Sequence, residues 1–198
     1  VLKEYEDVET EAMRYGTSMH NAAEKYVRDK TPLPPEFEYI HAGLDSLLGI
    51  AGEKLCEFRM GLTEELEPCG FFAEDVWWRG IADLIILDAE KHRAWVVDYK
   101  TGKSARYADK GQLELMALAV FKHFPVVKQV KAGLLFVVCN ELIKEQYSQK
   151  DQTLLWDKWT GKFTQMKTAF EVDVWNANPS GLCRNHCAVL ECVHNGRN

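Results

Sequence analysis

The sequence lacks the features of several large classes of protein. No apolar run reaches the roughly 18 residues that a membrane-spanning helix needs, and the longest ones, IADLIIL and AGLLFVV, have the length of strands. Lys and Arg are not in excess, because the formal net charge is −6, and this argues against a protein that holds nucleic acid by bulk positive potential. No internal repeat or low-complexity tract is visible. The remaining composition, 198 residues with 46% apolar and 27% charged side chains, is that of one soluble globular domain.

Helical patterns lie at both ends of the chain, and strand patterns lie between them. Thr17 or Ser18 is the expected N-cap of a helical stretch, TSMHNAAEKYV. Apolar residues spaced three or four apart predict helices over residues 3–29, 35–50, 107–124 and 153–176. A spacing closer to two predicts strands over residues 54–63, 72–87, 94–100 and 130–139. This order predicts an α/β (or α+β) fold, with a central mixed sheet flanked by helices. We expect a single domain over 1–198, made of N-terminal helices (1–52), a core (53–150), and a C-terminal helix with a cysteine-containing tail (151–198).

Two apolar strands joined by a polar turn carry the most informative residues. In RGIADLIILDAEKHRAWVVDYKTGK, a turn centred on Glu90 and Lys91 would place Asp83 opposite Asp98. Residues directly opposed in an antiparallel pair have Cβ atoms about 4.5–5.5 Å apart. Lys100 would lie on the same face as Asp98, because side chains alternate along a strand.

Two close carboxylates repel each other unless a positive charge lies between them. A divalent cation such as Mg²⁺ supplies that charge and can activate a water for attack on a phosphodiester. Lys100 could then orient or deprotonate the water and offset charge on the phosphate. The alternative is a surface network in which Asp83 and Asp98 pair with Lys100 and Arg79.

These motifs resemble those of the PD-(D/E)xK nuclease superfamily, and in particular its RecB-like exonuclease branch, which includes CRISPR adaptation nucleases and phage exonucleases. GIAD and VVDYKTGK are similar to that branch's G-x-x-D and D-Y-K-[TS]-G strands. RYGTSMHNAAEKYV resembles its upstream helix with a His, and GQLELMALAVF its downstream helix that opens with Gln-Leu. The family helix often has an aromatic residue four positions after the Gln, where this chain has Met116.

The resemblance implies a restriction-endonuclease-like core and a set of functional residues. Metal ligands for Mg²⁺ or Mn²⁺ would be His20, Asp83, Asp98 and the backbone carbonyl of Tyr99. Lys100 would be the catalytic lysine, and Gln112 would contact substrate or position Lys100. Glu24, one turn after His20, could form a supporting hydrogen bond outside the set of ligands, or be an ordinary exposed charge. Glu57, on the preceding strand, could join the acidic cluster.

Three cysteines gather in the last residues of the chain. Cys183, Cys187 and Cys192 follow the spacing C-x3-C-x4-C, which favours a metal site over disulfides. In many members of the RecB-like branch such a trio joins an upstream cysteine to bind a 4Fe-4S cluster. Because the sequence begins at Val1, we expect an upstream segment that would hold this fourth ligand. Otherwise His186, His194 or Cys69 would complete a zinc site, or the thiols would bind no metal.

The sequence therefore predicts a metal-dependent DNA exonuclease acting on linear or single-stranded DNA in recombination, repair or phage DNA processing, in the cytoplasm of a bacterial or phage-infected cell. Arg79, Lys103, Arg106 and Tyr107 are expected to bind the DNA. An oligomer is compatible with this function, and no membrane partner is expected. Two alternatives stay open: a catalytically inactive DNA-binding or scaffolding subunit, and a cysteine-rich metal-binding regulator.

Overall fold

The computed structural model describes residues 9–106 and 108–196. They form two compact units. The larger is Glu11–Lys158, and the described part of the smaller comprises residues 9–10 and 159–196. The larger unit contains the whole sheet, so Asp83, Asp98 and Lys100 all belong to this unit.

A six-stranded mixed sheet forms the centre of the larger unit, in the order β2-β1-β3-β4-β5-β6. Neighbouring strands are antiparallel except for β4 and β5, which are parallel. The strands are β1 (Glu53–Leu62), β2 (Pro68–Cys69), β3 (Trp78–Asp88), β4 (Arg93–Lys100), β5 (Gln129–Phe136) and β6 (Glu141–Ser148). The predicted α/β fold with a mixed sheet flanked by helices is therefore confirmed.

Helix α3 (Lys110–His123) connects the two parallel strands and covers one face of the sheet. Its N-cap is Asp109, whose carboxylate accepts a hydrogen bond from the Gly111 backbone N–H at 2.8 Å. Leu113, Leu118 and Phe121 are among its fully or almost fully buried side chains. A helical crossover of this kind is what a parallel pair of strands requires.

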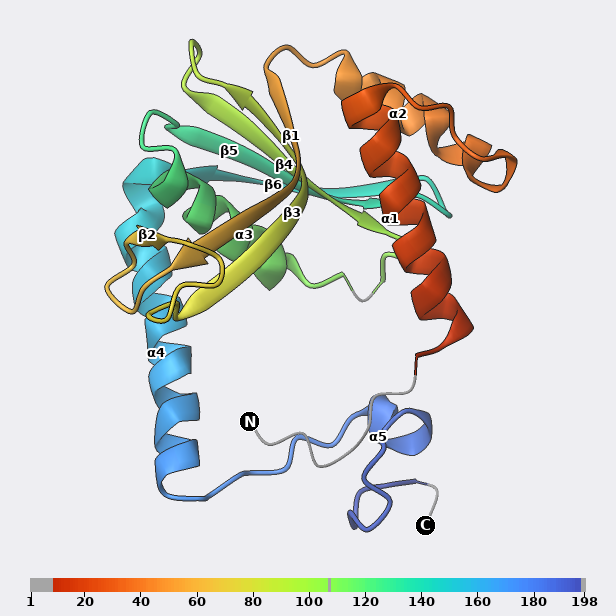
Figure 1. Ribbon diagram of the computed structural model, residues 1–198. Helices are drawn as coiled ribbons and strands as arrows, with labels where there is room; N and C mark the ends of the chain where they lie inside the picture. Colours follow the sequence, from red (N-terminus) through yellow and green to blue (C-terminus); the bar gives the residue numbers. More distant parts are fainter. Residues whose placement is uncertain (1–8, 107, 197–198) are drawn as a thin grey trace. The chain divides into compact units, whose positions relative to one another are not determined.

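Helix α1 (Glu11–Asp29), the 3₁₀ helix η1 (Pro35–Ile40) and helix α2 (His41–Leu48) lie on the other face (Figure 1). Alternation along β4 fixes these two faces. Val97 and Tyr99 belong to the core that includes Met19 of α1 and Leu44 of α2, whereas Asp98 and Lys100 contact Gln112 of α3.

Several predicted boundaries are wrong. Thr17 and Ser18 are not N-caps, because α1 begins at Glu11, and the Thr17 hydroxyl donates within the helix to the Met13 carbonyl at 3.1 Å. The strand predicted over 72–87 begins only at Trp78. Residues 70–77 form turns, and we call them the β2–β3 loop.

The prediction also missed two strands. β2 is only two residues long, and β6 is an edge strand whose side chains are mostly exposed or half-buried. Such a strand has no regular apolar alternation to reveal it.

The C-terminal tail folds around short backbone contacts. Helix α4 (Gln152–Glu171) precedes it, and Ser180 caps the short helix α5 (Gly181–Asn185). The buried Asn195 side chain donates to the carbonyls of Cys187 (3.3 Å) and Val189 (2.8 Å). The tail therefore consists of one short helix among turns and irregular segments. Across the described part of the chain, no helix has the length and apolar character to cross a membrane.

Candidate active site

The β3–β4 hairpin has the register that its sequence predicts. Leu87 pairs with Ala94 and Ile85 with Val96, and the ladder ends at Leu84 and Val97. Asp83 and Asp98 are the next residues along, where the two strands part. Both are buried, at 8% and 7% exposure. The Asp83 carboxylate reaches across to β4, where its Oδ2 accepts a hydrogen bond from the Tyr99 backbone N–H at 2.6 Å.

Strand β1 changes the direction of its side chains beside this point. Cys56 packs against the core on the α1 side, but Phe58 contacts His123 and Phe124 on the α3 side, although residues two apart normally share a face. Glu57 lies between them with φ +49°, in the left-handed region that is unusual for a non-glycine residue. This backbone conformation accounts for the change of face and places the Glu57 carboxylate beside Asp83.

His20, Glu57 and Asp83 form a group that could hold a metal ion, and we call it the cation group. One ligand atom of each residue lies within 4.8 Å of those of the other two. His20 Nδ1 and Asp83 Oδ1 are 3.0 Å apart. One turn earlier on α1, Gly16 lies against the end of β4, since a Cβ there would be 3.5 Å from Thr101 Oγ1. Three different elements thus deliver one nitrogen and two carboxylate ligands to one place.

Lys100, Asp98 and Gln112 form a second network next to the cation group. The Lys100 ammonium is 2.7 Å from Asp98 Oδ2 and donates to Gln112 Oε1 at 3.0 Å. The Gln112 amide in turn donates to Asp98 Oδ1. Gln112 therefore fixes both the lysine and the carboxylate from the first turns of α3.

The carboxylates of the site carry more negative charge than their surroundings neutralise. Burial, and then the charge of Asp83, raises the pKa of Asp98, although Lys100 acts against this rise. Burial and Asp83 also raise the pKa of Glu57. Burial acts to lower the pKa of His20, but the hydrogen bond and charge of Asp83 outweigh it, so this pKa is raised. An oxygen-rich site with one imidazole and unbalanced negative charge fits a divalent cation such as Mg²⁺ or Mn²⁺.

Among the described residues, the cation group is the single set of three or more such ligands that converges. Asp98 lies outside this tight set because Lys100 and Gln112 hold its two oxygens. Its role as a metal ligand, and that of the Tyr99 carbonyl, stay predictions. Glu57, which the sequence left as an alternative, is brought into the set by its backbone conformation.

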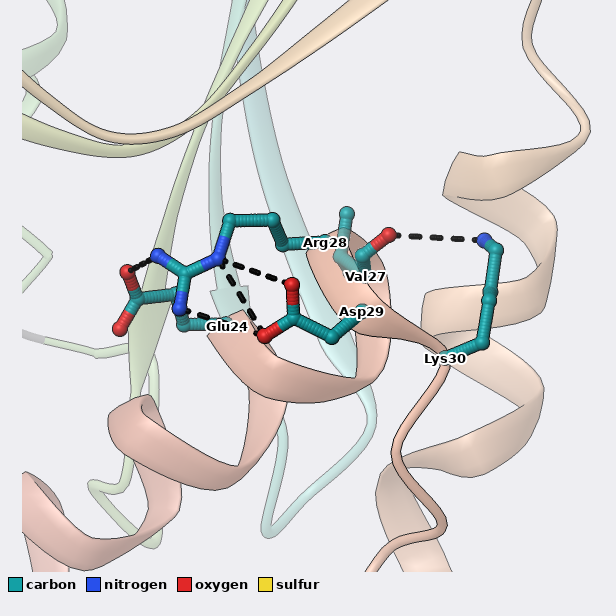
Figure 2. A network of polar contacts seen from close by, with 5 residues as sticks. All are labelled: Glu24, Val27, Arg28, Asp29 and Lys30. Atoms are coloured by element: carbon teal, nitrogen blue, oxygen red, sulfur yellow. Dashed lines mark hydrogen bonds and ion pairs between the residues drawn. The ribbon is translucent and has the colours of Figure 1, made fainter.

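Glu24 lies outside the cation group, although its charge adds to the rise that burial causes in the pKa of Glu57. The Glu24 carboxylate accepts from Arg28 Nη1 at 2.5 Å, and the same guanidinium contacts Asp29 at 3.2 Å (Figure 2). Lys30 closes the end of the helix by donating to the Val27 carbonyl at 3.4 Å. Glu24 is thus part of an exposed network at the end of α1.

The residues predicted to bind DNA are spread more widely. Lys103 lines a pocket of about 400 Å³ together with Tyr15 and Thr101. Arg106 is exposed, and Tyr107 lies outside the described residues. Arg79 stands four residues before Asp83 on β3, with its guanidinium over Phe71. Met116 is buried and borders Gly80, so it packs beneath the sheet.

The cysteines of the tail come from one short segment. The Asn195 N–H donates to the Cys192 carbonyl at 2.8 Å, and the Gly196 N–H to that of Cys183 at 3.3 Å. Asn195 also binds the Cys187 carbonyl through its side chain. The backbone therefore draws the three cysteines together, while their sulfurs do not form a convergent ligand set of the kind found at His20, within the residues that the structure describes.

Comparison with known proteins gives one extensive match. A family model described as "PD-(D/E)XK nuclease superfamily" matches residues 1–192. No curated protein matches the chain. Among solved structures, "Crystal structure of SSO0001" is similar at 16% sequence identity and a TM-score of 0.32, over 75% of this chain and 79% of that chain.

We predict that the metal-free protein loses stability as pH rises. Asp98 and Glu57 have raised pKa values in the folded state, so this state binds protons more tightly than the unfolded chain does. Their contribution falls as pH increases from the ordinary carboxyl values of 3.8 and 4.5 through the raised ones. The contribution of His20 is complete below 6.5 and falls through its own raised pKa. Urea unfolding in EDTA measures this slope.

In the Glu57→Gln variant, the free energy of unfolding should fall less steeply with pH than in the wild type, because one of the titrating groups is gone. Glu53→Gln, at the exposed start of the same strand, is the matched control and should keep the wild-type slope. A stability that rises with pH above the carboxyl range in EDTA would contradict the excess of negative charge at the site.

Proposed function

The chain belongs to the PD-(D/E)XK nuclease superfamily, and on this premise we propose that it is a Mg²⁺- or Mn²⁺-dependent deoxyribonuclease of the RecB-like exonuclease branch. The observation that carries the proposal is the adjacency of the cation group (His20, Glu57, Asp83) to the network of Asp98, Lys100 and Gln112. One part offers ligands for a cation, and the other holds a lysine in a fixed position beside it.

His20, Asp83 and Glu57 would hold the cation, with Asp98 and the Tyr99 carbonyl as further ligands. A divalent ion, when bound, offsets the carboxylate charge, activates a water and stabilises charge on the phosphate. Lys100 would hold or deprotonate the attacking water, or donate to the phosphate oxygen that gains charge. Gln112 would keep the ammonium group aimed at that position, because it binds Lys100 and Asp98 at once.

The alternative is a catalytically inactive subunit that binds DNA or serves as a scaffold. An inactive site has no need to keep Asp83, Asp98 and Lys100 together, yet the three lie at one point with a connecting glutamine. The connected set therefore favours the enzyme over both the scaffold and the cysteine-rich regulator.

A structural metal in the tail is a separate part of the proposal. Cys183, Cys187 and Cys192 would be three ligands of a 4Fe-4S cluster, with zinc as the second choice. The backbone hydrogen bonds of Asn195 and Gly196 to these cysteines support it. A small rearrangement would then bring the sulfurs together around the metal.

The preferred substrate is linear or single-stranded DNA, the substrate class that the resemblance to the RecB-like exonuclease branch implies. Work in recombination, repair or phage DNA processing, in the cytoplasm, fits such an activity. An oligomer would make the enzyme processive by keeping hold of the strand.

We expect the purified protein to degrade linear DNA in Mg²⁺ or Mn²⁺, and Asp98→Asn and Lys100→Ala each to reduce the rate by at least about 100-fold. End-labelled linear DNA and circular single strands measure the rate and separate exonuclease from endonuclease cleavage. Asp88→Asn is the matched control, because Asp88 is a buried carboxylate at the opposite end of the hairpin. Wild-type protein that binds DNA without cutting it would favour the scaffold instead.

Protein prepared without air should contain about four iron atoms and four sulfides per chain. Cys187→Ser should lower the iron content, whereas Cys139→Ser, an exposed cysteine of the larger unit, should not. Stoichiometric zinc would support the second choice, and a metal-free tail would refute both.

A further inference from the structure

We propose that the sheet face beside the cation group is a binding subsite for unpaired DNA, in which Arg59 and Arg79 bind phosphates and the Phe72 ring stacks on a base. This inference rests on the proposed nuclease function and extends it, because it assigns a path for the strand. Arg79 was expected to contact DNA from its position in the sequence; Arg59 and Phe72 were not.

The register of β1 and β3 places the subsite next to the cation group. Beyond Glu57, the Phe58 side chain is directed to the α3 side, where it contacts His123. A Cβ at Gly80 would point to the same side, because it would meet Met116 of α3. Arg59 and Arg79 alternate with them and therefore point to the opposite face. Arg59 pairs with Ile81, and Arg79 with Gly61. At about 3.3 Å per residue, Arg79 lies roughly 13 Å along the strand from Asp83, which about four stacked nucleotides would span.

This part of the face is open to solvent. Arg59 and Arg79 are exposed, and the apolar side chain of Ile81 between the strands is 37% exposed. An extended strand could thus run along the sheet from the cation group to Arg79.

Among the described residues, neither guanidinium has a carboxylate at ion-pair distance, although the charge of Arg59 acts on Glu57 and opposes the rise that burial causes in the pKa of that carboxyl group. Several other cations of the larger unit have carboxylate partners, such as Arg28 with Glu24 and Lys158 with Glu114. In a chain with a net charge of −6, two unpaired arginines close to the same rings form a local positive site that suits phosphate.

Aromatic rings complete the subsite. Phe71 and Phe72 of the β2–β3 loop meet edge to face with centroids 4.9 Å apart. Arg59 lies 5.6 and 5.9 Å from the two centroids, and Arg79 lies 5.5 and 6.0 Å from them. Phe72 is nevertheless 73% exposed, so the arginines leave much of this ring uncovered. A large exposed aromatic ring between cations is the arrangement that binds single strands.

The stacking partner has to be an unpaired base. Bases inside a duplex already stack on their neighbours and do not offer their faces to a side chain. The subsite therefore selects single-stranded DNA, or the frayed end of a duplex, for delivery to the cation group.

The test measures the affinity for fluorescent single-stranded oligothymidine by fluorescence anisotropy, at several salt concentrations. EDTA is present so that cleavage cannot occur. Phe72→Ala should weaken binding roughly 5- to 150-fold without changing the salt dependence, and Phe72→Trp should restore it. The double variant Arg59→Ala, Arg79→Ala should weaken binding and reduce the slope of log K against log salt by about 1.4, the value for two lost phosphate contacts on a single strand.

Two controls match these changes. Arg93→Ala removes another arginine that lies over a ring, that of Trp95, at the turn end of the hairpin. Phe170→Ala removes another ring that is largely exposed. Both should bind the oligonucleotide like the wild type. Circular dichroism tests whether each variant is folded. If Phe72→Ala is unfolded, the affinity of Phe72→Trp for the oligonucleotide still tests whether an aromatic ring at this position binds DNA.

The inference is overturned if folded variants at Phe72, Arg59 and Arg79 bind like the wild type, or if the controls weaken binding equally. It is also overturned if duplex DNA without free ends, or single-stranded RNA, binds more tightly at this surface than single-stranded DNA. These outcomes leave the nuclease proposal intact when the wild type still cleaves DNA in Mn²⁺. Absence of cleavage with normal binding in EDTA refutes the proposed function instead.

Discussion

The site depends on negative charge that is buried at the point where β3 and β4 separate. Asp83 and Asp98 are buried there on neighbouring strands, and Glu57 joins them from β1. Buried carboxylates this close are costly unless they are protonated or neutralised by a cation. Burial, and after it the charge of Asp83, raises the pKa values of Asp98 and Glu57. The rest of the site consists of groups that reduce it, namely the Lys100 ammonium, the Tyr99 N–H and the His20 imidazole.

The sheet links this charge to two different surfaces. Because Glu57 adopts a left-handed conformation, β1 directs Cys56 and Phe58 to opposite faces. The cation group can then receive His20 from α1 on one side, while Asp98 and Lys100 receive Gln112 from α3 on the other. A residue held in a strained conformation persists when the surrounding structure requires it, often at a functional site. The same change of face leaves the side of the sheet with Arg59 and Arg79 open beyond the carboxylates.

Local patterns were sufficient to predict the register of the β3–β4 hairpin, and tertiary effects account for what they missed. The polar turn and alternating apolar residues determine the β3–β4 register, so the opposition of Asp83 and Asp98 followed from sequence. The conformation of Glu57 did not, because a left-handed backbone is uncommon for a glutamate and has no signal in the sequence around it. Residues 72–77 were predicted to belong to a strand, so the β2–β3 loop and the position of Phe71 and Phe72 on it were not predicted. The exposed edge strand β6 was missed because it lacks an apolar pattern. In the tail, the cysteines could be recognised as candidate ligands, but the hydrogen bonds to their backbone carbonyls could not be predicted.

The central claim is that one divalent cation neutralises the buried carboxylates. A crystal structure in Mn²⁺, with anomalous scattering recorded near the manganese edge, tests it most directly. The account predicts one strong anomalous peak within about 2.5 Å of His20 Nδ1 and an Asp83 carboxylate oxygen, with the direct His20–Asp83 contact of 3.0 Å opened by the ion. A His20–Asp83 hydrogen bond that persists without an anomalous peak beside it, at millimolar Mn²⁺, would contradict the account.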